Sequence, residues 1–246
     1  MTRNLAGAAR MEWIKLRGLR STWATLAVTV AGAAAIGATV GANTRDAGAD
    51  LTNNALAGIT VGLLAIGVLG VLAMTGEYSS GTIRSTLAAV PDRWAVLAAK
   101  AAVFGAMALA AGELAAFVAF AAGGAALPAP IAAPSLGQPA VLRAVVLSGF
   151  GFALVGLLGL GLGAVLRHTP AAIGALVGGV WVAGQLAGAL AHRLMGWVPI
   201  SIVANSLAVS RPLAGFLSPW AGLGVLALYA AAALAAGGWL LARRDA

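Results

Sequence analysis

Cysteine is absent from this chain, and charged side chains are scarce. The absence of cysteine excludes disulfides, thiol catalysis and thiolate metal sites. Only 9% of the residues are charged, whereas soluble domains are typically about 25% charged. The chain is instead 61% hydrophobic, with repeated apolar runs of about 20 residues, long enough to cross a bilayer as helices. This composition predicts a polytopic membrane protein.

Lysine is also scarce, since the chain has only Lys15 and Lys100. A Walker A loop, Gly-x-x-x-x-Gly-Lys-Ser/Thr, holds phosphates with its backbone amides and its lysine. Neither lysine follows a glycine, so the chain cannot bind ATP in this way. His168 and His192 fall on opposite sides of the expected membrane and cannot share a metal. HExxH and GxSxG motifs are missing, so we expect no catalytic, metal or cofactor site in this chain.

The apolar runs predict an all-α membrane protein with six transmembrane helices and an N-terminal amphipathic elbow helix. Residues 1–20 are basic but include Trp13 and Ile14, so a helix there is expected at the membrane surface, with Trp13 at headgroup level. Residues 21–246 form the transmembrane domain. Segment 192–218 is expected to hold short helices on the outer surface. The expected spans are roughly 21–42, 55–75, 101–126, 144–166, 170–191 and 219–241.

The distribution of Lys and Arg predicts the orientation of these spans. Eleven of the fifteen lie in residues 1–20, in Gly76–Lys100, at Arg167 and at the C-terminal end. Arg45, Arg143, Arg193 and Arg211 fall on the other side. Because the richer side is normally cytoplasmic, both termini are expected in the cytoplasm, which agrees with an even number of spans. The net charge of +8 then reflects these flanking residues, and we expect no nucleic-acid partner.

Gly76–Lys100 is a charged island between two long apolar runs. Ser79 to Thr82 marks a break with Thr82 as a candidate N-cap, and a short helix is expected over Ile83–Ala89. Pro91 ends that helix, and a new helix from Arg93 runs into the third span. The product is a short, exposed, positively charged helix at the mouth of the second and third spans, suited to docking into a groove on a partner. The alternative is a solvated connector without a partner.

The island resembles the cytoplasmic segment of ABC-2-type permeases, the membrane subunits of a class of ABC transporters. The opening EWIKLRGLRSTW, the six spans and the long last outer segment also look like that family, so the resemblance covers essentially the whole chain. The island positions that match are Glu77, Gly81, Thr82, Arg84, Leu87, Pro91, Arg93 and Lys100.

The resemblance implies a permease subunit of an exporter in the cell membrane. Two such subunits, identical or different, would form the pathway, and each would dock on a separate cytoplasmic ATP-binding subunit that holds the ATP and magnesium. Glu77, Arg84 and Arg93 are expected at the contact with that subunit, with Gly81 and Thr82 shaping the start of the helix.

Two polar residues within the expected spans are candidates for the transport pathway. Glu113 lies thirteen residues beyond Lys100, or about 20 Å along a helix, near the middle of the bilayer. Intramembrane carboxylates are costly and often functional. Gln185 lies in the middle of the fifth span. For both, the alternative is a structural hydrogen bond between helices. Small-xxx-small pairs such as Gly159/Gly163 and Gly174/Gly178 predict close helix packing.

Two other classes of function stay open. A proton-coupled secondary transporter would use Glu113, although inverted halves and broken helices are not evident. A membrane immunity or scaffold protein would transport nothing. For an exporter, the apolar spans favour a hydrophobic or amphipathic cargo such as an antibiotic, drug, peptide or lipid, without choosing among them.

Overall fold

The computed structural model describes residues 2–209 and 216–243, and this part of the chain contains helices and loops only. Six of the described helices are long and apolar enough to cross a membrane, which confirms the predicted number and order of spans. They are α2 (Arg20–Asn43), α4 (Ile59–Ser79), α6 (Arg93–Ala125), α7 (Pro139–Leu166), the run Thr169–Leu190, and α11 (Pro219–Arg243). Arg211 and Arg244 lie outside the described residues.

The other helical segments that the structure describes are short, except α1 near the N-terminus. Three of them, α8 (Thr169–Gly174), the π-helix η1 (Ala175–Ala183) and α9 (Gly184–Leu190), together form the fifth span. The others are α1 (Thr2–Gly18), α3 (Leu51–Ala55), α5 (Thr82–Ala89), the 3-10 helix η2 (His192–Trp197) and α10 (Pro199–Leu207).

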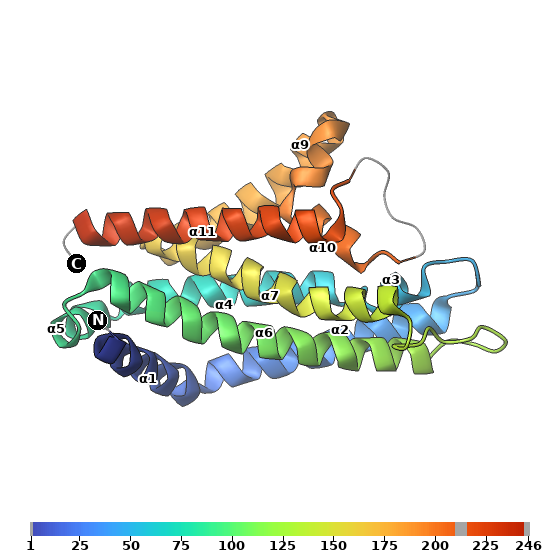
Figure 1. The fold of residues 1–246 in the computed structure, drawn as a ribbon, viewed down its shortest axis with the longest axis horizontal. Helices are drawn as coiled ribbons and strands as arrows, with labels where there is room; N and C mark the ends of the chain where they lie inside the picture. The colour runs from blue at the N-terminus through green and yellow to red at the C-terminus, as the bar shows by residue number, and fades with distance from the viewer. Residues whose placement is uncertain (1, 210–215, 244–246) are drawn as a thin grey trace.

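Helix α7 lies inside the bundle and packs against α4, α6 and α11, while α2 packs against α6 and α4 (Figure 1). The first turn of α1, the last turn of α11 and α5 lie at one end of the bundle, and α3 lies at the opposite end (Figure 1). Helix α1 packs on α6 through Ala8, Glu12 and Leu16, which recur every four residues and therefore share one face. A helix is thus present over Thr2–Gly18 and packs on the bundle, while its predicted place at the membrane surface stays a prediction.

Capping residues set helix boundaries that hydropathy alone placed a few residues away. The second span begins at Ile59, because residues 51–55 form the separate helix α3, whose N-cap Asp50 accepts a hydrogen bond from Asn53 N at 3.0 Å. Helix α6 begins at Arg93, where the sequence predicted a new helix, and the Asp92 side chain accepts from Ala95 N at 3.1 Å. The fourth span begins at Pro139, since proline is favoured in the first helical turn.

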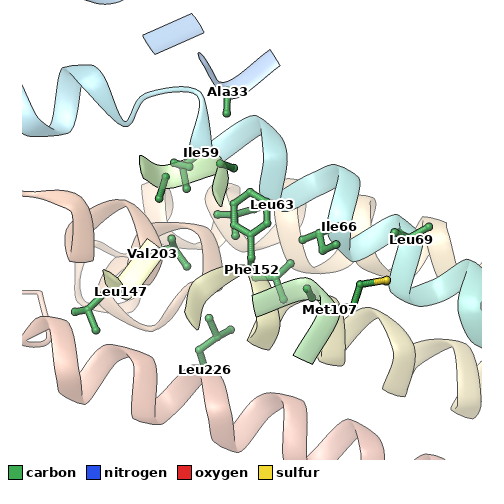
Figure 2. Packing of buried hydrophobic residues seen from close by; sticks show 14 of the residues in the cluster. Ala33, Ile59, Leu63, Ile66, Leu69, Met107, Leu147, Phe152, Val203 and Leu226 are labelled. Atoms are coloured by element: carbon green, nitrogen blue, oxygen red, sulfur yellow. The ribbon is translucent and has the colours of Figure 1, made fainter. Parts of the chain in front are cut away.

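The core is centred on Phe152 of α7, which is fully buried (Figure 2). Leu63 and Ile66 of α4, Met107 of α6 and Leu226 of α11 belong to the same cluster. Two glycines make room for the ring. A methyl group at Gly62 would lie 2.6 Å from Phe152 Cζ, and one at Gly112 would lie 2.5 Å from Phe152 Cβ.

Glycines also bring α4 and α7 into backbone contact. A methyl group at Gly159 would overlap the carbonyl oxygen of Gly67, and one at Gly70 would overlap that of Gly156. Gly163 lies against Val71 in the next turn. The predicted close packing of the Gly159/Gly163 pair is therefore confirmed, because only residues without a side chain let the two backbones approach this closely.

The fifth span behaves differently from the other five. Only 11% of its apolar window is buried, against 28% or more in each of the others. Helix α9 projects away from the bundle (Figure 1). Nothing in the described structure lies within 4 Å of a methyl group built on Gly174, Gly178 or Gly179. The expectation of close packing at Gly174/Gly178 is therefore not met within the described chain.

The segment after the fifth span contains the expected short helices, but their expected place on the surface is wrong for α10. Ile202, Val203 and Leu207 are buried, and α10 packs against α7 and α11. The buried residues of α10 lie on most sides of the helix, so neighbouring helices must cover most of its surface. Two hydrogen bonds fix the residues that follow α10. Arg143 Nη2 donates to Ala208 O at 2.8 Å, and Val209 N donates to Asp50 Oδ2 at 2.6 Å.

Candidate functional site

The turn before α5 is built on Gly81, which has a φ of +72°. That left-handed conformation suits glycine, since it has no Cβ to clash. The sequence suggested Thr82 as the N-cap of this helix, but the N-cap is Gly81 and Thr82 is the first residue of α5. The Thr82 hydroxyl lies 2.9 Å from Ser80 Oγ. The helix ends at Ala89, before Val90 and Pro91. Its predicted extent is therefore confirmed to within one residue.

Helix α5 has one buried face and one exposed face. Ile83 and Thr86 point into the protein, and both are 3% exposed. Arg84, Ser85 and Ala88 lie on the exposed side. The helix lies at the end of the bundle where α1 begins and α11 ends (Figure 1). It therefore presents a small surface with positive charge beyond the membrane-spanning helices.

Beneath α5, four charged side chains from three helices form a buried charge cluster. Lys15 Nζ of α1 donates to Glu12 Oε1 at 2.8 Å and to Glu77 Oε1 of α4 at 2.7 Å. Lys100 Nζ of α6 donates to the same Glu77 oxygen at 2.7 Å and to Glu12 Oε2. Each lysine thus bridges both carboxylates, and the cluster has no net charge.

Helix α5 is tied to the charge cluster through Thr86. Lys15 Nζ donates to Thr86 Oγ1 at 2.9 Å. The Thr86 hydroxyl lies 3.4 Å from Glu77 Oε2 and 3.1 Å from the carbonyl oxygen of Thr82, so it donates to one of them. One polar side chain therefore couples the exposed helix to α1, α4 and α6 together.

The charge cluster is deeply buried, which makes its pairing essential. Glu12 is 1% exposed, Lys100 3% and Glu77 8%. Removing one partner from a buried ion pair typically costs about 3–5 kcal/mol, because the remaining charge is left uncompensated. Lys15 is nearer the surface, and burial by itself lowers its pKa. Its hydrogen bonds to Glu12 and Glu77 and their negative charges outweigh burial, so the pKa of Lys15 is raised above its ordinary value.

Two arginines close the same end of the bundle by binding the last turn of α11. Arg93 Nη1 donates to Leu241 O at 2.6 Å, and Arg167 Nη2 donates to Leu240 O at 3.0 Å. Carbonyl groups in the last turn of a helix generally lack partners within that helix, and cationic side chains there also complement the helix dipole. The Arg167 guanidinium lies 5.1 Å from the centroid of the Tyr78 ring. The end of α11 is thus fixed to α6 and to the end of α7, and Arg167 also contacts Tyr78 of α4.

The five residues predicted at a partner contact therefore divide into two groups. Gly81, Thr82 and Arg84 are exposed on or beside α5. Glu77 points inward to Lys15 and Lys100, and half-buried Arg93 binds the end of α11. In this structure, Glu77 and Arg93 position the exposed surface and do not form it.

The two polar residues predicted in a transport pathway are not brought together. Glu113 of α6 lies against Gly149 of α7, where a side chain would occupy the space of its carboxylate. Its Oε2 atom is buried and has no hydrogen-bond partner among the described residues. Gln185 is exposed on α9, and its Oε1 accepts from Ser201 Oγ of α10 at 3.2 Å.

The charge cluster includes Glu12 and Lys15, which the sequence did not mark as functional. Two features of the sequence could have indicated this cluster. The first is the spacing of three residues, which places Glu12 and Lys15 on one helix face. The second signal was the rarity of lysine, since the two lysines of the chain are the two cations of the charge cluster.

Two comparisons of the whole chain with known proteins identify no relative. No model of a known protein family matches the chain, and a search of curated proteins also finds no match.

Proposed function

We propose that this chain is the membrane subunit of an ATP-driven exporter of the ABC-2 type, with α5 as the docking site for a separate ATP-binding subunit. The observation that carries the proposal is the construction of α5. It is exposed on one face through Arg84 and Ser85, and it is fixed on the other to three helices through Thr86 and the charge cluster. A solvated connector needs no such attachment.

This attachment supplies a route for mechanical coupling. Closure of an ATP-bound motor would push on the exposed face of α5, and the charge cluster would pass that displacement to α1, α4 and α6 together. Such rigid-body movement of packed helices is a common form of conformational switching. ATP and magnesium would be held by the partner subunit, and this chain would contribute the membrane pathway without a catalytic site.

The exposed fifth span supports a second permease subunit in the same complex. Its glycine face at Gly174 and Gly178 meets nothing in the described chain, although such faces normally pack against another helix. The pathway would then lie between two copies, or between this chain and a similar one. The excess of Lys and Arg at the α5 end supports a cytoplasmic location for that end in the cell membrane.

Co-purification of the complex from its native cells tests this proposal. The tagged chain is expected to retain a Walker A-containing ATPase in a fixed stoichiometric ratio, because the docking surface is specific. Arg84→Glu should reduce the retained ATPase at least tenfold by reversing the charge of α5. Arg45→Glu is the matched control, since Arg45 is also exposed but follows α2. Retention that is equal in both variants would contradict docking at α5.

The buried Oε2 atom of Glu113, which has no hydrogen-bond partner in the described part of the chain, favours a second candidate, a proton-coupled transporter of the same hydrophobic or amphipathic cargo. Transport into inverted membrane vesicles separates the two. An ABC exporter requires ATP and tolerates collapse of the proton gradient. A secondary transporter requires the gradient and works without ATP, and Glu113→Gln should abolish its coupling. A protein that moves no cargo under either condition would fit an immunity or scaffold role.

A further inference from the structure

An apolar groove of about 1000 Å³ runs between α1, α2 and α6. Its walls include Trp13 of α1, Trp23 and Leu26 of α2, and Ala106 and Met107 of α6. The indole nitrogen of Trp23 donates to the backbone oxygen of Arg17 at 3.1 Å, so this polar atom is already satisfied. The groove therefore suits a hydrocarbon occupant and offers few polar contacts along its walls.

The length of the groove matches one leaflet of a membrane. Its lining residues on α6 extend from Ala102 to Leu114, which is about 18 Å at 1.5 Å per residue. Half of the hydrocarbon core of a bilayer is about 15 Å. An acyl chain that enters at one end of the groove would therefore be covered along most of its length.

Two arginines lie near the end of the groove at which the two tryptophans lie. On α1, Arg17 follows Trp13 by four residues and so shares its face. On α2, Arg20 precedes Trp23 by three residues and lies on the face that carries Trp23 into the groove. Both arginines are exposed. One end of the groove is thus cationic while its walls are apolar, and this pattern matches an anionic amphiphile.

We propose that this groove binds an anionic phospholipid, with one acyl chain between α2 and α6 and the phosphate at Arg17 and Arg20. Tryptophan beside the arginines suits the headgroup region, where indole rings are favoured. The asymmetry of charge favours a lipid over an apolar helix from a second copy, which would have no use for cations at one end. The proposal does not depend on the transport activity.

Native mass spectrometry of the purified full chain can test the proposal with two defined probes, dioleoyl phosphatidylglycerol and dioleoyl phosphatidylcholine. One phosphatidylglycerol per chain should be retained in preference to phosphatidylcholine. Arg17→Gln with Arg20→Gln should weaken that retention about 25-fold, since each arginine near an anionic surface contributes about 1 kcal/mol. Arg45→Gln, at an exposed arginine beyond the other end of α2, should leave it unchanged.

A second variant tests the groove separately from the charge. Ala106→Trp should fill the groove and reduce retention of phosphatidylglycerol at least fivefold. Leu228→Trp, on the exposed side of α11, adds a similar side chain elsewhere and should have no effect. Equal retention of the two lipids, or retention unaffected by Ala106→Trp, would overturn the proposal. So would efficient crosslinking of two copies through Ala110→Cys, which is specific because the chain has no cysteine, since the groove would then be a subunit interface.

Discussion

Replacement of Lys100 by methionine should strongly destabilise the protein, because it removes one of the two cations of the charge cluster. Lys100 is 3% exposed and donates to Glu12 and Glu77. A hydrogen bond to a charged group contributes about 1.5–3 kcal/mol, so two such bonds correspond to about 3–6 kcal/mol. This range agrees with the typical cost of about 3–5 kcal/mol for breaking a buried ion pair. We therefore expect a loss of about 4 kcal/mol in the free energy of unfolding.

The assay is reversible unfolding in mixed micelles, followed by the fluorescence of the seven tryptophans. Lys15→Met is the matched control, because the Lys15 side chain is 31% exposed and water can replace its contacts. The free energy of unfolding of this variant should fall by only about 1 kcal/mol. Combining Lys100→Met with Glu12→Met should cost less than the sum of the two single changes, since the pair is removed together. A loss below about 1 kcal/mol for Lys100→Met, or equal losses for the two lysines, would refute this account of the charge cluster.

Three further predictions concern Lys15, the packing around Phe152, and Glu113. The raised pKa of Lys15 means that its contribution to stability is complete below the unfolded-state value of about 10.4 and is lost as pH rises through the higher folded-state value; the midpoint of thermal unfolding should therefore fall more steeply above about pH 10 in the wild type than in Lys15→Met. Gly112→Ala should cost about 1–3 kcal/mol by crowding Phe152, whereas Gly224→Ala in α11 should not destabilise the protein in the same unfolding assay, because no described atom lies within 4 Å of the added methyl group. Glu113→Gln should change stability by less than about 1 kcal/mol, because the buried Oε2 atom has no hydrogen-bond partner among the described residues to lose.

The features that the sequence predicts well are local ones. Each span follows from a single apolar run, and α5 follows from Gly81 at one end and Pro91 at the other. The burial of α10 was harder to predict, because its nine residues are too few to identify a spanning helix. Its run of Ile200, Ile202 and Val203 was the available signal, since a surface helix would expose at least one of these side chains.

The charge cluster could not be predicted in the same way, because it depends on contacts that are distant in sequence. Lys100 lies 88 residues from Glu12 and 23 residues from Glu77. Hydropathy places each charge near the end of a span, where an exposed position is the ordinary expectation. Only the packing of α1 on α6 turns Glu12 inward toward Lys100. Glu77 of α4 turns inward to Lys15 of α1 and Lys100 of α6, which lie on other helices, so a residue predicted at the exposed contact is buried.

The use of charges in place of apolar contacts under α5 has a mechanical consequence. Apolar surfaces can slide past one another with little change in burial, but a buried carboxylate that loses its lysine remains uncompensated. Moving α1 away from α6 by a few ångströms would separate Glu12 from Lys100, while moving α4 would separate Glu77 from both lysines. Each movement costs several kcal/mol, comparable to the whole stability of many proteins. The three helices are therefore expected to move together, and Thr86 ties the exposed helix α5 to the same charge cluster.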